Sequence, residues 1–83
     1  MHNKLKWRAY VSADELDLYS LRESEYAGWW TVRRRTNRRR YYVRLSEAYD
    51  LAMYRCTLEA GGVCSVPPTA NLYSPAREVA GEA

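Results

Sequence analysis

The segment from Trp29 to Leu45 constrains the fold most, because two runs of alternating residue type flank a short polar turn. In both runs the apolar and aromatic residues expected to face the core fall on every second position. They are Trp30 and Val32 in the first run and Tyr41, Val43 and Leu45 in the second. Alternation with period two is typical of half-buried strands. Two such strands around a turn near Thr36-Asn37 predict a β-hairpin.

Two further strands are expected upstream of the hairpin. Lys4–Ser12 alternates cleanly and carries aromatic and β-branched residues. The next stretch is open to two interpretations. Ser12 and Glu15 have the spacing of a capping box, which would start a short helix. The alternation from Leu16 onward favours instead a turn at 13–15 followed by a strand at 16–23, which is the preferred interpretation.

One helix is expected after the hairpin. Ser46 suits the N-cap, and Gly61-Gly62 supplies the stop. The apolar stripe expected to face the sheet has helical spacing and consists of Leu45, Ala48, Tyr49, Ala52, Met53 and Cys56. Residues 63–66 could add a short closing strand. Pro67-Pro68 is expected to end regular structure, so residues 67–83 are predicted to be a mobile tail, in which Leu72 and Tyr73 could dock on the domain.

These elements predict an α+β fold, an antiparallel meander of three to four strands with one C-terminal amphipathic helix packed on one face. The helix is expected to cover the side bearing Trp7, Trp30, Val32, Tyr41 and Val43. Residues 1–66 would form a single compact domain. The other face of the sheet would be left to water or to a partner.

Charge is unevenly distributed along the chain. Residues 1–45 hold eleven basic against five acidic residues, whereas residues 46–83 hold two against five. The hairpin alone holds seven arginines and no acid, and the stretch 13–25 has a net charge of −4. A concentrated positive pole attracts a negatively charged partner.

The arginine-rich hairpin is therefore the candidate binding surface. The guanidinium fork binds phosphate or carboxylate with two hydrogen bonds and stacks on rings. Arginine interleaved with Trp and Tyr suits contacts to phosphates together with stacking on bases. The candidate binding residues are Trp29, Arg33, Arg34, Arg35, Arg38, Arg39, Arg40, Tyr42 and Arg44.

A purely structural interpretation competes with this one. Arginines on exposed strand positions can lie over Trp29 and Tyr42 in cation–π contacts and keep the sheet soluble. The acidic stretch from Asp14 to Glu25 could also neutralise part of the cluster. We favour a binding surface, because so dense a positive field repels itself unless a partner uses it.

Catalytic and metal-binding roles lack the residues they need. His2 is the only histidine, so a nucleophile has no credible base, and we expect no enzyme. Cys56 and Cys64, without histidines nearby, do not form a metal site, and no glycine-rich phosphate loop is present, so no cofactor is expected. No secretory leader or membrane span is expected either, which favours cytoplasmic residence with free thiols, although a Cys56–Cys64 bridge is geometrically possible.

Three segments resemble small DNA-binding domains of the AP2 type and of integrase arm-binding domains. They are Gly28-Trp29-Trp30-Thr31-Val32-Arg33, Asn37-Arg38-Arg39-Arg40-Tyr41-Tyr42 and Ser46-Glu47-Ala48-Tyr49-Asp50-Leu51-Ala52. The resemblance covers under half of the chain. It implies that a sheet lies in the major groove of DNA, with these residues reading it: Trp29, Arg33, Arg35, Arg40, Tyr42 and Arg44.

In size and compactness the chain is also similar to the short inhibitor proteins of phages and mobile elements, anti-CRISPR proteins among them, although no motif defines that group. This resemblance implies a monomeric inhibitor, acting in the host cytoplasm, that engages a nucleic-acid-processing complex through nucleic acid or an acidic protein surface. We prefer this hypothesis to direct DNA binding. A structural or assembly subunit is a third possibility, and neither a small-molecule substrate nor a membrane is expected as a partner.

Overall fold

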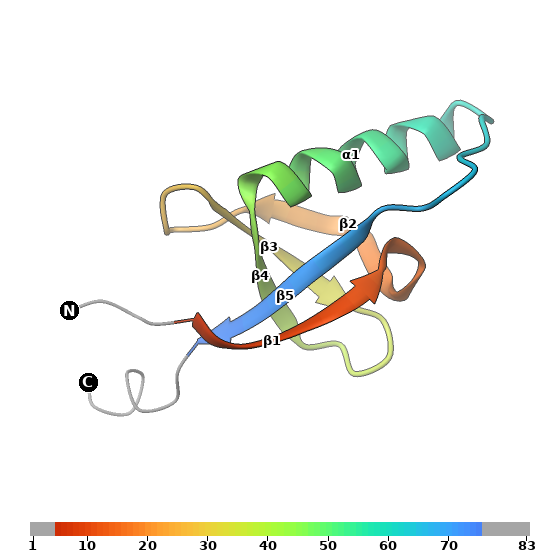
Figure 1. Ribbon diagram of the computed structural model, residues 1–83. Helices are drawn as coiled ribbons and strands as arrows, with labels where there is room; N and C mark the ends of the chain where they lie inside the picture. The colour runs from red at the N-terminus through yellow and green to blue at the C-terminus, as the bar shows by residue number, and fades with distance from the viewer. Residues whose placement is uncertain (1–4, 76–83) are drawn as a thin grey trace.

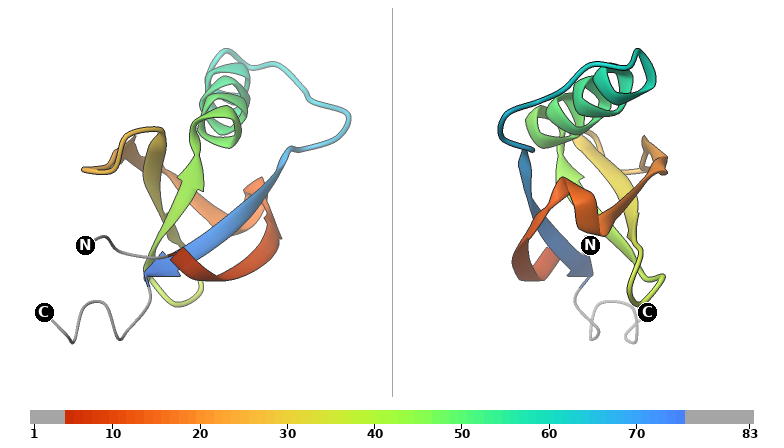
Figure 2. Two further views of the ribbon diagram at one scale, coloured as in Figure 1. Left: turned by 60° about the vertical axis from the view of Figure 1, so that its left-hand side comes forward. Right: turned by 90° about the vertical axis from the view of Figure 1, so that its right-hand side faces the viewer.

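The computed structural model describes residues 5–75 as one five-stranded antiparallel sheet and one long helix (Figure 1). In chain order the elements are β1 (Leu5–Ser12), the 3-10 helix η1 (Ala13–Glu15), β2 (Leu16–Glu23), β3 (Trp29–Arg34), β4 (Arg40–Arg44), α1 (Leu45–Glu59) and β5 (Thr69–Pro75). The sheet is strongly curved, and α1 lies along one side of it (Figures 1 and 2). The α+β class with one helix against an antiparallel sheet is confirmed.

The sheet differs from the predicted meander in its number of strands and in their order, which is β1-β5-β4-β3-β2. The fifth strand, β5, belongs to the segment that the sequence assigned to a tail. It pairs with β1 from Leu5↔Pro75 to Ser12↔Thr69 and so separates β1 from the hairpin. Ala70 and Leu72 are fully buried. Residues 76–83 of the predicted tail lie outside the described residues.

The segment after β1 follows the preferred of the two interpretations: residues 13–15 form a turn and residues 16–23 form a strand. Ser12 Oγ accepts a hydrogen bond from the Asp14 N–H at 3.1 Å, which caps η1. The Ala13 N–H donates to the Pro68 carbonyl oxygen at 3.0 Å and ties this turn to the start of β5. Pro68 therefore adjoins a strand, and the proposed closing strand at 63–66 is wrong because those residues form a connection.

The helix α1 lies where it was expected, but its predicted cap and its predicted inner face are both wrong. Arg44, the last residue of β4, is the N-cap in place of Ser46. Glu47 completes the start: its Oε1 accepts from the Arg44 N–H at 3.1 Å and its Oε2 from the Asn71 N–H at 3.0 Å. The stop is as predicted, with Gly61 at φ +82°.

The face of α1 that meets the sheet consists of Ala48, Leu51 and Tyr54. Of the predicted stripe only Ala48 is buried, whereas Leu45, Tyr49, Met53 and Cys56 are exposed. Since β4 runs directly into α1 without a loop, the direction of the strand fixes which side of the helix turns inward. The described helices include none that is long and apolar enough to cross a bilayer.

The core lies between the curved sheet and α1. It joins residues of all five strands to the inner face of the helix, and its largest fully buried side chains are Leu16, Leu51, Leu72, Val32 and Val43. Of the sheet residues expected under the helix, Val32, Tyr41 and Val43 are in the core and Trp30 packs against it. Trp7 is 43% exposed and its ring contacts Tyr41.

Candidate nucleic-acid interface

The hairpin β3–β4 presents one set of side chains to the core and another to the outside. Its register pairs Trp29 with Arg44, Thr31 with Tyr42, and Arg33 with Arg40. Side chains on every second position share a face, so these six residues form one outer ladder. The predicted alternation is confirmed here, with Arg33 and Arg40 at one end of the ladder and Trp29 and Arg44 at the other.

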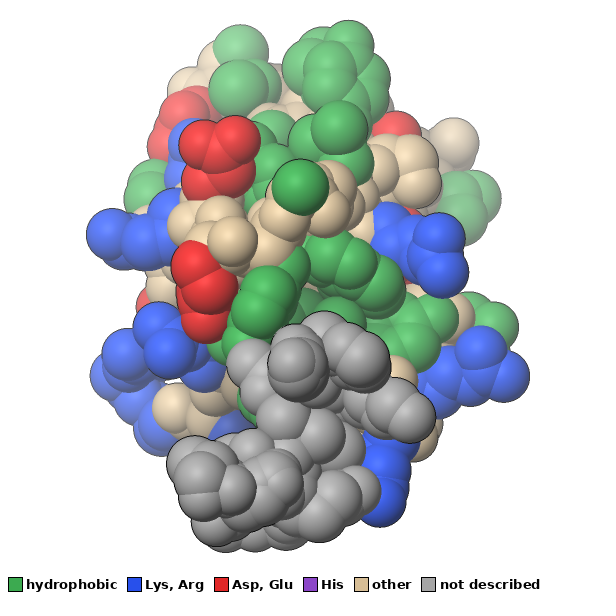
Figure 3. Space-filling view, turned by 90° about the vertical axis from the view of Figure 1, so that its left-hand side faces the viewer, with side chains coloured by type: hydrophobic (Ala, Val, Ile, Leu, Met, Phe, Trp, Pro, Cys, Tyr) green, Lys and Arg blue, Asp and Glu red, His purple; other side chains and the backbone are tan. Residues whose placement is uncertain are grey.

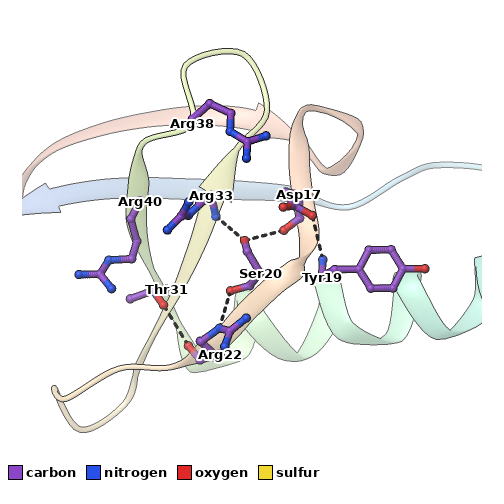
Figure 4. A pocket seen from close by; sticks show the side chains of 8 residues that line it. All are labelled: Asp17, Tyr19, Ser20, Arg22, Thr31, Arg33, Arg38 and Arg40. Atoms are coloured by element: carbon purple, nitrogen blue, oxygen red, sulfur yellow. Dashed lines mark hydrogen bonds between the residues drawn. The ribbon is translucent and has the colours of Figure 1, made fainter.

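Four arginines line a groove of about 460 Å³ at the first end of this ladder. Arg33 comes from β3, Arg40 from β4, Arg38 from the turn that joins them, and Arg22 from β2 (Figure 4). We call this hollow the basic groove. The rest of its lining is polar or aromatic: Asp17, Tyr19, Ser20 and Thr31.

A distortion in β2 shapes the basic groove. The pairing of β2 with β3 shifts register between Asp17 and Arg22. Ser20 bridges this irregularity, since its Oγ donates to the Asp17 carbonyl at 2.7 Å and accepts from the Arg33 N–H at 2.7 Å. Thr31 Oγ1 donates to the Arg22 carbonyl at 3.3 Å. These bonds hold the backbone that carries Arg22 and Arg33 (Figure 4).

The groove arginines make no ion pair within residues 5–75, although one carboxylate lines the groove with them. None of Arg22, Arg33, Arg38 and Arg40 forms an ion pair with a described acidic residue. Asp17 lines the groove, and its Oδ1 accepts a hydrogen bond from the Tyr19 N–H at 3.2 Å. Arg33 and Arg40 lie directly opposite each other on neighbouring strands, an arrangement of like charges that destabilises a sheet. An anion bound between them would remove that repulsion.

The other arginines of the predicted cluster do not line the groove. Arg34 lies on the opposite face of β3, where its Nη2 is 3.0 Å from Glu15 Oε1 and its side chain is only 25% exposed. Arg35 and Arg39 are exposed at the turn. Asn37 shapes this turn by accepting from the Arg39 N–H at 3.0 Å, and Arg38 takes a positive φ of 58°.

Rings gather at the far end of the outer ladder. Trp29 and Tyr73 meet edge to face with ring centroids 5.2 Å apart, and the Arg44 guanidinium lies 5.2 Å from the Trp29 ring. Tyr42 also faces this side, but the Tyr26 ring covers it at 5.4 Å and leaves it 5% exposed. The expectation that Tyr42 forms part of an open reading face is thus corrected, because the β2–β3 connection folds over it.

A second hollow, of about 500 Å³, opens between these rings. We call it the aromatic hollow; Leu5, Glu25, Tyr26, Ala27, Trp29, Arg44 and Tyr73 line it. Figure 3 looks onto this end of the molecule, where hydrophobic side chains run down the middle with Lys and Arg on both sides. Burial raises the pKa of Tyr42, and the charge of Glu25 raises it further.

Sequence reasoning missed Arg22, Asp17 and Tyr26 as parts of these hollows. Arg22 is the one basic residue in an acidic stretch, and only its position on β2 beside Thr31 brings it to the groove.

Cys56 and Cys64 are both free thiols. Within residues 5–75 no three His, Cys, Asp or Glu side chains gather in a way that could hold a metal ion.

No protein-family model, no curated protein and no solved structure matches this chain.

Proposed function

We propose that this protein is a non-enzymatic binding protein that holds the phosphate backbone of nucleic acid in its basic groove. One observation carries the proposal: four arginines from three strands and a turn surround a single groove, and no described acid pairs with them. Arginine presents several N–H donors in a fixed fork that matches phosphate oxygens. The groove therefore offers the charge and the geometry that a phosphate chain requires.

The proposal implies a strong dependence on salt. If the four arginines neutralise about four phosphates, binding releases counterions, and this release becomes less favourable as salt is added. The affinity for duplex DNA should then fall by roughly 100-fold between 50 and 200 mM salt. Contacts to phosphate carry no sequence information by themselves. Binding through the groove alone should thus be indifferent to base sequence.

The test compares two triple variants with the same loss of charge. One variant replaces three of the four groove arginines with alanine: Arg33, Arg38 and Arg40. The control variant replaces three exposed arginines that do not line the groove: Arg8, Arg35 and Arg39. Both are titrated with single-stranded and duplex DNA and with RNA at two salt concentrations. Loss of salt-sensitive binding in the first variant only supports the groove. An equal loss of affinity in both variants would mean that binding depends on net charge and not on the groove. If the folded wild type binds none of these nucleic acids, free nucleic acid is excluded as the ligand.

A second candidate function is inhibition of a nucleic-acid-processing complex, as in the anti-CRISPR-like hypothesis. The outer side of α1 favours a protein partner, since Leu45, Tyr49 and Met53 recur at every fourth position and are each about half exposed or more. Apolar residues at that spacing are typical of a helix that packs on another surface. In this scheme the groove holds nucleic acid within the complex while α1 contacts protein. The double variant Tyr49→Ser, Met53→Ser should then no longer inhibit the nucleic-acid-processing complex, but its binding to free nucleic acid should be unchanged.

A further inference from the structure

We infer that the aromatic hollow takes an unpaired nucleobase from the same strand whose phosphates lie in the basic groove, so that the preferred ligand is single-stranded. This inference rests on the proposed function and specifies its ligand. It is carried by the composition of the hollow and by its position relative to the groove.

The composition of the hollow suits a flat, uncharged ring. Trp29 and Tyr73 stand almost perpendicular, with an interplanar angle of 83°, and both are only partly buried. The guanidinium of Arg44 lies over Trp29 and adds a planar, positively charged surface. Bases stack on aromatic side chains and on guanidinium planes in single-strand recognition. The hollow is lined by one cation and one anion, Arg44 and Glu25, so their opposite charges give an ammonium group no clear advantage.

The two hollows lie on one line along the sheet. Arg33 and Trp29 are on the same face of β3, and Arg40 and Arg44 are on the same face of β4. Four residues of strand span about 13 Å at the usual rise of about 3.3 Å per residue. A few nucleotides cover that distance, within the roughly 4 to 16 nucleotides that small single-strand-binding domains occupy.

The middle of the ladder, between the two hollows, is covered by a neighbouring ring. Thr31 and Tyr42 are the cross-strand pair at the middle of the ladder, and they are 4% and 5% exposed. The Tyr26 ring covers Tyr42, and Tyr26 also lines the aromatic hollow. A backbone that leaves the arginines would therefore pass over Tyr26 to reach the rings of Trp29 and Tyr73.

Duplex nucleic acid cannot use both hollows in this way. Its bases are paired and stacked inside the helix, and extracting one costs a few kcal/mol. A single strand has bases free to stack. We therefore expect single-stranded DNA or RNA of about eight nucleotides to bind more tightly than duplex of the same length.

The decisive experiment removes the bases from the ligand and leaves the protein intact. A single-stranded octanucleotide is compared with an abasic oligomer of the same length, which keeps every phosphate. The intact oligomer should bind roughly 5- to 150-fold more tightly, the range that stacking of one base provides. Trp29→Leu should lose this advantage and bind both oligomers like the abasic one, whereas Trp7→Leu, outside the hollow, should keep it.

The outcomes separate the two proposals. If the intact and abasic oligomers bind equally, and both depend on Arg33, Arg38 and Arg40, the groove stands and the base site is overturned. If neither oligomer binds, the proposed function itself fails. Occupation of the hollow by tetramethylammonium, seen as quenching of fluorescence that Trp29→Leu removes, together with equal binding of the two oligomers, would identify a cation site instead. Since the oligomer comparison uses wild-type protein, misfolding of a variant cannot obscure it.

Discussion

Arg33 and Arg34 are neighbours in the sequence, yet the fold gives them opposite environments. Arg33 is exposed in the basic groove, and no described acid pairs with it. Arg34 is largely buried on the other face of β3 and pairs with Glu15. An arginine paired within the fold stabilises it, whereas an unpaired arginine facing a like charge is available to a ligand. The density of a charge cluster therefore overstates the size of the binding surface.

The largest expected effect comes from removing the facing arginines of the groove. Arg33→Ala with Arg40→Ala should weaken binding to a single strand by about 100-fold or more, because charge-assisted hydrogen bonds contribute about 1.5 to 3 kcal/mol each. The same change should leave the free energy of unfolding unchanged or raise it by a few tenths of a kcal/mol, since like charges across a strand pair are relieved. Fluorescence anisotropy and urea unfolding measure the two effects. A parallel loss of stability would indicate that these arginines support the fold.

Arg34→Ala should produce the reverse pattern. It breaks the pair with Glu15 and removes packing of a side chain that is three-quarters buried. We expect a loss of about 1 kcal/mol in the free energy of unfolding, at the upper end for partly exposed ion pairs. Affinity for nucleic acid should fall by less than about threefold, the screened effect of one distant charge. A loss as large as that of Arg33→Ala would remove the distinction between the two residues.

Sequence patterns carry part of this distinction. Alternation along β3 and β4 places Arg33 and Arg34 on opposite faces, although the density of charge led to both being named as binding residues. The bounds of β2 match the preferred interpretation of 16–23. The partner of Arg34 could not be predicted in this way, because Glu15 is nineteen residues distant and meets it only through the pairing of Leu16 with Arg34. Arg22 likewise reaches the groove only because β2 shifts register beside β3.

Two parts of the fold were not predicted correctly, because the local sequence pattern is ambiguous in one and weak in the other. The helix α1 carries apolar residues on both sides, so periodicity alone could not choose Leu51 and Tyr54 over Tyr49 and Met53. The strand β5 follows Pro67-Pro68 and has only Ala70 and Leu72 as buried side chains, a weak pattern by itself. Its stability comes from pairing with β1 along its length, which is a tertiary effect.

Tyr42 offers a smaller test of the aromatic end. Burial, followed by the charge of Glu25, raises its pKa above the ordinary value of 10.0. A group whose pKa is raised by folding stabilises the protein at lower pH, and this contribution disappears as the pH rises through the folded pKa. The free energy of unfolding should therefore fall as the pH rises above about 10, and less steeply in Tyr42→Phe than in the wild type. Identical slopes would mean that the Tyr42 hydroxyl is hydrated like that of an exposed tyrosine.

The smallest expected effect concerns which base the aromatic hollow prefers. Glu25 is the one acidic residue that lines the hollow, and its carboxylate can accept a hydrogen bond from the amino group of a base. Cytosine has such a group at N4, whereas thymine has a carbonyl there, which would face the carboxylate as a second acceptor. An oligomer of cytosine should thus bind a few-fold more tightly than one of thymine, and Glu25→Gln, which adds a donor, should reduce the difference. Because both oligomers carry the same phosphates, the groove contributes equally to each, and an unchanged preference in Glu25→Gln would place the discrimination on stacking at Trp29.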